Sequence, residues 1–238
     1  MKPVVKQLLG KTIISVQAYE DTPLYGPEYM RVMAESVLLG GAEGLRACWP
    51  QDIRAIRAVT DKPLIGIYKD FPDADPLDSV YITPTVARAA EVIEAGADIL
   101  ALDCTLRPRR DIEALKDMLL EIRERWPQIA VMADLSTPEE GIAVAETGLV
   151  DIISTTLSGY TRSSLSRLSD KPDTELIREF KKSFSVPVNG EGRIWELRDL
   201  EAVWEAGADM VTIGSAVTRP HLITRRFVDC SHRVNGDG

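Results

Sequence analysis

Cysteine and histidine are scarce in this chain of 238 residues, which contains three cysteines and two histidines. No two cysteines form a C-x-x-C pair, so the sequence predicts no zinc site and no other metal site. A small, odd number of cysteines is typical of proteins in a reducing compartment. We therefore expect a cytoplasmic protein.

Long hydrophobic runs and basic blocks are also missing. No stretch reaches the roughly 18 apolar residues of a membrane span, and the N-terminus has no signal-peptide pattern. Lys and Arg number 28 against 37 Asp and Glu, a net charge of −9, which disfavours nucleic acid and anionic membranes as partners. Because neither a G-x-G-x-x-G nor a P-loop pattern occurs, nothing indicates a dinucleotide or ATP cofactor.

Short apolar runs do recur along the whole chain, each followed by a longer stretch of helical periodicity. They are spaced about 30 residues apart, the size of one βα unit. The runs are 12–17, 42–47, 63–69, 98–103, 129–134, 151–156, 187–191 and 209–214. Near-continuous apolar character is typical of parallel strands buried on both faces. The predicted fold class is α/β, a single-domain (β/α)8 TIM barrel. An open doubly wound sheet is the alternative, because it alternates strands and helices too.

Helical patterns and glycines mark the intervening segments. Apolar residues recur on one face in 111–125 and in 173–184, and Asp173 is placed to cap the second helix. Glycine is favoured where a helix ends in the left-handed conformation. The glycines expected to end helices in this way are Gly40, Gly96, Gly148 and Gly207.

No domain-sized linker interrupts the pattern. We expect one barrel over residues 1–230 and a flexible C-terminal tail over 231–238. The longest irregular stretches, 70–82 and 156–172, are the expected active-site loops.

A polar residue follows each apolar run, at the strand ends where barrels of this type place their chemistry. The ring predicts a cavity with two cations, three carboxylates, an amide and hydroxyls. Its members are Gln17, Arg46, Lys69, Asp103, Asp134, Thr155 with Thr156, Glu191, and Gly214 with Ser215. Asp103 fits equally well as a helix cap.

Lys69 and Glu191 are the candidate catalytic residues. A lysine at the end of the hydrophobic strand L-I-G-I-Y-K is partly desolvated, which suits it to act as a base or to form a Schiff base. Glu191, in N-G-E-G-R, is flanked by glycines that allow a ligand to approach the backbone closely. The alternatives are a lysine that reaches the rim to form a salt bridge and a glutamate on a surface turn.

The segment I-G-S-A-V-T-R-P, residues 213–220, is the candidate phosphate site. Gly214 and Ser215 lie where a strand meets a short helix, and backbone N–H groups at such a point bind phosphate. Arg219 would add a charged fork to the same phosphate. The alternative is an ordinary tight turn with a solvated arginine.

These motifs together resemble the bacterial N-acetylmannosamine-6-phosphate 2-epimerases, also called N-acylglucosamine-6-phosphate 2-epimerases, over nearly the whole chain. The more specific stretches are E-G-R-I at 191–194 and I-G-S-A-V-T-R-P-x-x-I-T-x-R-F at 213–227; S-V-Q-A, G-L-R-A, I-G-I-Y-K and T-T-L-S-G-Y-T also match. The sequence departs from the family at Gly190, where alanine is common.

The resemblance implies interconversion of N-acetylmannosamine 6-phosphate and N-acetylglucosamine 6-phosphate in sialic-acid catabolism, with no cofactor. It assigns the catalytic acid/base to Lys69, with Glu191 beside it. The residues expected to bind the substrate are Gln17, Arg46, Asp134, Thr156 and Arg193. Those expected to bind its phosphate are Gly192, Gly214, Ser215 and Arg219. The expected partners are this small sugar phosphate and a second copy of the chain, since a homodimer is common for such enzymes.

The implied reaction is proton abstraction at C2, next to the open-chain aldehyde, and return of a proton to the opposite face. Two other functions remain open on the residues alone. One is a Schiff-base aldolase that uses Lys69 as the amine, and the other is a sugar-phosphate sensor without turnover. The barrel fold does not distinguish them.

Overall fold

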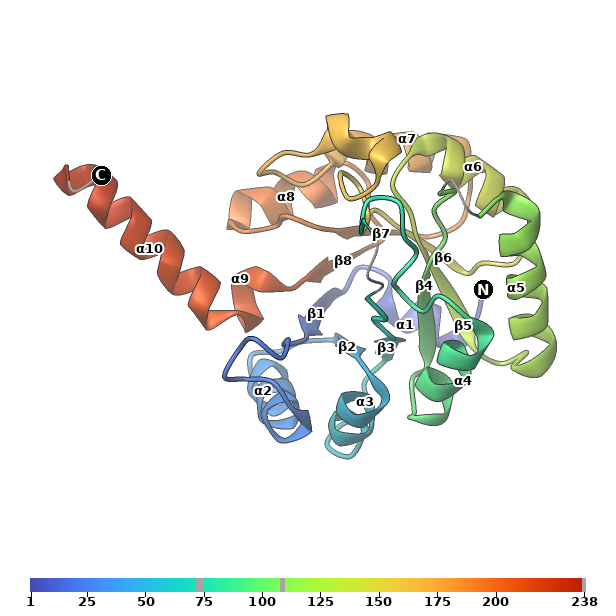
Figure 1. The fold of residues 1–238 in the computed structure, drawn as a ribbon, viewed down its shortest axis with the longest axis horizontal. Helices are drawn as coiled ribbons and strands as arrows, with labels where there is room; N and C mark the ends of the chain where they lie inside the picture. Colours follow the sequence, from blue (N-terminus) through green and yellow to red (C-terminus); the bar gives the residue numbers. More distant parts are fainter. Residues whose placement is uncertain (72–74, 108–109, 237–238) are drawn as a thin grey trace.

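The computed structural model describes residues 1–71, 75–107 and 110–236 and contains a closed barrel of eight parallel strands (Figure 1). Neighbours in the chain are neighbours in the barrel, and the last strand pairs with the first. The strands are β1 (Thr12–Val16), β2 (Gly44–Cys48), β3 (Leu64–Ile67), β4 (Ile99–Asp103), β5 (Ala130–Asp134), β6 (Ile152–Ser154), β7 (Val188–Glu191) and β8 (Met210–Ile213). The predicted (β/α)8 fold and its eight strands are confirmed, and the open sheet is excluded.

The helices lie mostly around the barrel, between successive strands, and the last of them projects away from it (Figure 1). They are α1 (Pro3–Leu8), α2 (Pro27–Leu39), α3 (Pro50–Arg57), α4 (Val86–Glu94), α5 (Ile112–Arg125), α6 (Pro138–Glu146), the 3₁₀ turn η1 (Arg162–Arg167), α7 (Thr174–Ser183), α8 (Leu197–Glu205), α9 (Ser215–Thr218) and α10 (Pro220–Asn235). The predicted cap at Asp173 is present, since its side chain accepts a hydrogen bond from the Leu176 N–H. In the described part of the chain, no helix has both the length and the apolar character needed to cross a membrane.

The interior of the barrel is layered because side chains alternate in and out along each strand. Toward the N-terminal ends of the strands, Ile13, Ile65, Ile99 and Met210 form a buried apolar cluster. Val5 and Leu8 of α1 join the same cluster and are fully buried, so α1 closes that end of the barrel. Toward the C-terminal ends the inward residues become polar, which leaves that end for a ligand.

The departure at Gly190 has a packing reason. This glycine lies in β7 and faces outward, so a methyl group added to it would lie 2.4 Å from Cγ1 of Val203 and 3.2 Å from Cδ1 of Ile177. Val203 on α8 occupies the space that an alanine methyl would take. The substitution is thus accommodated by a helix that packs close to β7.

Two expectations about helix ends differ from the structure. Gly40 has φ −74°, in the right-handed region, whereas Gly41 has φ +93°. The left-handed residue therefore comes one position later than predicted. The other three glycines, Gly96, Gly148 and Gly207, have positive φ as expected. Residues 231–235, expected in a flexible tail, are the last turn of α10. Helical spacing from Phe227 to Val234 explains the continuation. Within the first expected active-site loop, residues 72–74 lie outside the described residues.

Candidate active site

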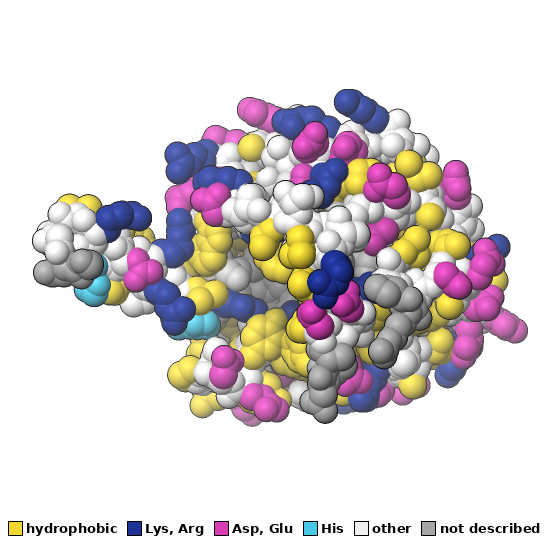
Figure 2. All heavy atoms as spheres, turned by 45° about the horizontal axis from the view of Figure 1, so that its top comes forward, with side chains coloured by type: hydrophobic (Ala, Val, Ile, Leu, Met, Phe, Trp, Pro, Cys, Tyr) yellow, Lys and Arg dark blue, Asp and Glu magenta, His cyan; other side chains and the backbone are white. Residues whose placement is uncertain are grey.

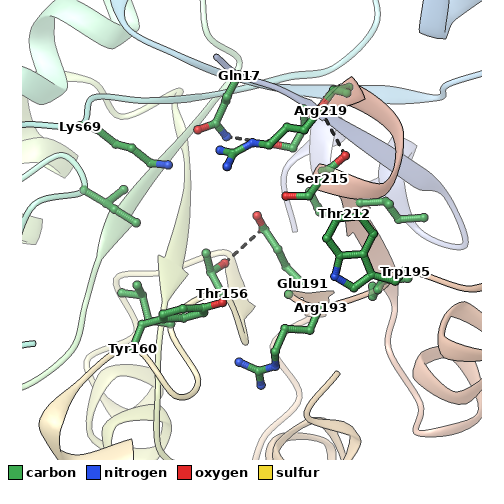
Figure 3. Close-up of a pocket in the computed structure, with 18 of the residues that line it drawn as sticks. Gln17, Lys69, Thr156, Tyr160, Glu191, Arg193, Trp195, Thr212, Ser215 and Arg219 are labelled. Atoms are coloured by element: carbon green, nitrogen blue, oxygen red, sulfur yellow. Dashed lines mark hydrogen bonds between the residues drawn. The ribbon is translucent and has the colours of Figure 1, made fainter. Parts of the chain in front are cut away.

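A cavity of about 400 Å³ opens at the C-terminal end of the barrel (Figure 3). It contains side chains from β1, β7 and β8 and from the segments that follow β1, β3, β6, β7 and β8. Its lining includes Gln17, Tyr19, Lys69, Tyr81, Thr156, Tyr160, Glu191, Gly192, Arg193, Trp195, Thr212, Gly214, Ser215 and Arg219. In a space-filling view the molecule is hollowed on this side, next to the projecting C-terminal helix (Figure 2). The structure therefore brings together nine of the eleven predicted site residues.

The other two, Arg46 and Asp134, form a buried ion pair beside the cavity rather than part of its lining. Arg46 is 1% exposed, and its two terminal nitrogens donate to the two carboxylate oxygens of Asp134 at 3.2 and 2.6 Å. The first of these nitrogens also donates to Oε2 of Glu191 at 2.9 Å. Arg46 therefore joins the carboxylates of β5 and β7 across the barrel.

Glu191 is held firmly by this network. Its Oε2 also accepts from the Thr156 hydroxyl at 3.1 Å and from the Asn189 amide at 3.3 Å. Burial raises the pKa of the Glu191 carboxyl above its usual range, although the Arg46 guanidinium opposes this shift. A carboxyl of raised pKa exchanges a proton more readily near neutral pH than an ordinary one does. Figure 3 shows the carboxyl group directed into the cavity.

Lys69 lies two residues beyond β3 and faces Glu191 across the cavity (Figure 3). No carboxylate among residues 1–71, 75–107 and 110–236 forms an ion pair with it, so the predicted alternative of a rim salt bridge is not seen within those residues. Its backbone oxygen accepts a hydrogen bond from the Trp49 indole at 2.9 Å. The amine is thus placed opposite a carboxyl, with space for a substrate between them.

Gln17 provides an unsatisfied polar group. Its amide nitrogen donates to the Ser15 hydroxyl at 2.7 Å, whereas its buried Oε1 has no hydrogen-bond partner in the described part of the chain. A buried acceptor without a partner costs free energy unless a ligand supplies a donor. This oxygen can accept a hydrogen bond from a substrate hydroxyl or amide.

The predicted phosphate residues lie together on one side of the cavity. Gly214 precedes the short α9, and the first N–H groups of a helix have no partners within it. Arg219 follows α9, and no described carboxylate pairs with its guanidinium. Gly192 has φ +111°, a conformation that side chains rarely adopt. The corner thus offers N–H donors and an uncompensated positive charge.

Arg193 lines the cavity, but its guanidinium is already engaged. It donates to the backbone oxygens of Ser158 and Lys171, at 2.6 and 2.8 Å. These bonds tie the loop after β6 to the loop after β7. Arg193 therefore shapes the cavity wall, and its predicted contact with substrate stays a prediction.

Sequence reasoning missed Tyr19, Asn189 and Trp195. Asn189 alternates with Glu191 on β7 and so points inward, a signal that the two-residue period already contained. Tyr19 and Trp195 lie in loops, where no periodicity indicates direction. Asp103, by contrast, lies outside the cavity and binds the Arg107 guanidinium at 3.0 Å.

No metal cluster is evident in the residues described, and the buried Cys48 does not provide a reactive thiol. Among them, no group of three or more His, Cys, Asp or Glu side chains is arranged to hold a metal ion. Cys48 is buried, and burial raises the pKa of its thiol to about 12. A thiol with so high a pKa is not a nucleophile at neutral pH.

Asp52 of α3 is a buried carboxylate outside the cavity. It is 1% exposed, and neither of its oxygens has a hydrogen-bond partner in the described part of the chain. Burial raises the pKa of this carboxyl to about 7. Since an unfolded aspartate has a pKa of about 3.9, the folded state retains the proton over a range where the unfolded state has lost it. The protein therefore loses stability as the pH rises from about 4 to about 7.

We expect Asp52→Asn to remove this loss, because the amide cannot ionise. The free energy of unfolding of the variant, relative to wild type, should rise by about 2–3 kcal/mol between pH 5 and pH 8. Urea titration at both pH values measures it, with Asp61→Asn at an exposed position as the control. A gain that is the same at both pH values would contradict the assignment.

Comparisons with known proteins agree with the geometry. A family model described as "Putative N-acetylmannosamine-6-phosphate epimerase" matches residues 30–233. Two relatives are described as "Putative N-acetylmannosamine-6-phosphate 2-epimerase". The one from Caldanaerobacter subterraneus subsp. tengcongensis is 43% identical, over 94% of this chain and 92% of the relative. The one from Clostridioides difficile is 40% identical, over 94% of this chain and 97% of the relative.

Solved structures show the same similarity. The N-acetylmannosamine-6-phosphate 2-epimerase from Clostridium perfringens is 38% identical, with a TM-score of 0.86 and 95% coverage of both chains. The deoxyribose phosphate aldolase from Aeropyrum pernix matches with a TM-score of 0.65 at 19% identity. The second similarity shows only that the barrel fold is shared.

Proposed function

Because the chain belongs to the family of N-acetylmannosamine-6-phosphate epimerases, we propose that the cavity at the end of its barrel is where it inverts C2 of this sugar phosphate. The chain is an epimerase, and inversion at C2 of N-acetylmannosamine 6-phosphate gives N-acetylglucosamine 6-phosphate, a step in sialic-acid catabolism. The small number of cysteines supports a cytoplasmic location.

Lys69 is the base in this proposal. The C2 proton is acidic only in the open-chain sugar, where the C1 carbonyl delocalises the charge that remains. The neutral amine takes the proton, the electrons of the C–H bond form the C1–C2 double bond, and O1 becomes an enolate oxygen. Return of a proton to the other face of C2, with loss of the proton held by the Lys69 ammonium, restores the C1 carbonyl and the neutral amine and inverts the centre.

Glu191 and Gln17 act on the oxygens of the substrate. The raised pKa of Glu191 suits it to give or accept a proton at a hydroxyl or at O1. The unpartnered Oε1 of Gln17 accepts a substrate O–H or N–H. Arg46, Asp134 and Thr156 fix the Glu191 carboxyl, and this support reduces the reorganisation needed during reaction.

The phosphate is bound at the corner formed by Gly192, Gly214, Ser215 and Arg219. Backbone N–H groups and an arginine fork together provide strong, directional donors to a phosphate. Binding energy at this remote group holds C2 against Lys69. Arg193 forms another part of the cavity wall, and in this proposal it contacts the sugar.

The single observation that carries the proposal is the position of Lys69. Its side chain faces Glu191 across the cavity, and the Lys69 amine forms no ion pair with any carboxylate of the described residues. Proton NMR of N-acetylmannosamine 6-phosphate with the enzyme in D2O tests it. We expect N-acetylglucosamine 6-phosphate with deuterium at C2. Retention of both the substrate and its C2 proton would sink the proposal.

A homodimer joined through α10 is the proposed assembly. This helix has no buried residue and extends away from the barrel (Figures 1 and 2). Phe227 and Val234 on it are 72% and 77% exposed, and Leu39 and Leu197 on the barrel helices α2 and α8 are 92% and 80% exposed. Exposed apolar patches of this kind mark protein interfaces. A second copy supplies complementary patches, because a two-fold interface uses the same surfaces twice.

We expect Phe227→Asp to dissociate the dimer, because a carboxylate would be buried in the apolar interface. Sedimentation equilibrium gives the mass of wild type and variant at equal concentration. Asp229→Lys, about 200° around the same helix, is the control and should remain dimeric. A monomeric wild type, or a dimeric Phe227→Asp variant, would refute the assembly.

A further inference from the structure

Tyr19 is a residue of the cavity to which no role has been assigned above. It lies three residues beyond β1, and its hydroxyl accepts a hydrogen bond from Nζ of Lys69. Its ring centroid lies 4.9 Å from that same Nζ and 4.7 Å from the guanidinium carbon of Arg219. The phenol therefore stands between the proposed base and the proposed phosphate arginine.

The ring of Tyr19 is held in place by aromatic neighbours. Trp49 and Phe71 meet it edge-on, with centroid distances of 6.0 and 6.1 Å. The Trp49 indole also donates to the backbone oxygen of Lys69. Trp49 thus fixes both the phenol and the main chain that carries the base, and such edge-on pairs add to the stability of the cluster.

The charges around Tyr19 act on its hydroxyl. Burial alone would raise the pKa of the phenol, but the Lys69 ammonium and the Arg219 guanidinium together lower it. The other titratable groups that interact with this pair are Tyr81, Cys48 and Glu191. The Tyr19 oxygen is consequently an acceptor beside two cations, and its strongest partner is Lys69.

We propose that Tyr19 is the positioning residue of the base, acting through its hydrogen bond from Lys69. The inference rests on the proposed function, since it concerns the same amine. Nζ carries N–H groups in both protonation states, so the phenol oxygen accepts from the neutral amine and from the ammonium. With one N–H fixed on Tyr19, the lone pair of the neutral amine is directed into the cavity.

The proton balance follows directly. Lys69 takes one proton from C2 and becomes an ammonium, while Tyr19 keeps its own proton throughout. The bond to Tyr19 is stronger in the ammonium state, because hydrogen bonds from charged donors are stronger than neutral ones. Tyr19 thus stabilises the state that proton abstraction creates.

Tyr19→Phe keeps the ring and removes only the acceptor. We expect kcat to fall roughly 10–100-fold, and KM to change less than kcat because the contact of the ring with Arg219 is kept. Loss of the acceptor favours the neutral amine, so the acidic limb of the pH profile should move to lower pH by roughly one unit. Packing alone would not move that limb.

Tyr25→Phe is the matched control. Tyr25 also packs edge-on against Trp49, with 6.0 Å between the ring centroids. Its hydroxyl lies 3.4 Å from Oε1 of Glu20, so its hydrogen-bond partner is Glu20 and not Lys69. This variant should keep the wild-type rate and pH profile. If Tyr19→Phe keeps the wild-type rate, or loses rate without moving the acidic limb, Tyr19 does not position the base.

A second substitution covers misfolding of the phenylalanine variant. Placing 4-fluorophenylalanine at position 19 keeps the ring and nearly the shape of tyrosine, but its fluorine is only a weak acceptor and cannot ionise. The acidic limb should therefore move in the same direction as in Tyr19→Phe; an unmoved limb would overturn the inference. Failure of the proposed function is distinguishable from failure of this inference. In the first case the wild-type protein itself would be inactive in the assay, and in the second only the effect of the Tyr19 variants would be absent.

Discussion

Lys69→Met should reduce kcat for epimerisation by roughly 10²–10⁴-fold, the usual contribution of a general base. The variant cannot take the C2 proton, so deuterium should no longer enter C2 from D2O. Binding of the sugar phosphate should remain, because Lys69 lies away from Ser215 and Arg219 (Figure 3). Thermal stability should change little, since no carboxylate in the described part of the chain pairs with this lysine.

Lys62→Met is the matched control for this experiment. Lys62 is exposed and precedes β3, at the opposite end of the strand from Lys69. Its removal should leave turnover unchanged. Borohydride treatment of wild type with substrate should give no covalent adduct; an adduct on Lys69 would indicate Schiff-base chemistry, and a fully active Lys69→Met variant would remove the lysine from the mechanism.

Arg46→Met should destabilise the fold by about 3–5 kcal/mol, the usual cost of removing one member of a buried ion pair. The loss arises because Asp134, fully buried, would retain a charge without its partner. At this chain length the melting temperature should fall by roughly 10 °C. Activity should fall as well, because Glu191 loses the guanidinium that holds its carboxyl.

Two further variants separate charge from packing. Arg46→Met combined with Asp134→Asn should recover part of the stability, since the unpaired charge is then removed. Arg31→Met, which breaks an exposed pair with Glu35 on α2, should cost only about 0.3–0.5 kcal/mol. Two results would argue against an essential buried network. One is an equal loss in the free energy of unfolding for Arg46→Met and Arg31→Met. The other is a loss in the variant that combines Arg46→Met with Asp134→Asn that equals the sum of the two single losses.

The amino-acid sequence was enough to predict the fold and the strand ends at which the functional side chains lie. Eight apolar runs at regular spacing predicted a barrel, because buried parallel strands need apolar residues on both faces. The polar residue after each run then predicted which side chains meet, because strand ends of a barrel lie on one ring. Gln17, Lys69 and Glu191 were found in this way, and all three line the cavity.

The contacts of each of these residues follow only from the folded structure. The resemblance placed Glu191 beside Lys69, whereas in the structure its carboxylate pairs with Arg46, because pairing between side chains of different strands depends on their height in the barrel. Tyr19 reaches Lys69 from a loop, where no repeat indicates direction. Helix α10 likewise continues through residues expected in a tail. That its apolar side chains are exposed follows only from the folded structure, because the barrel does not cover them. The local sequence pattern indicates whether a residue is buried. Which side chains pair across the barrel depends on distances between strands that are set only when the chain folds.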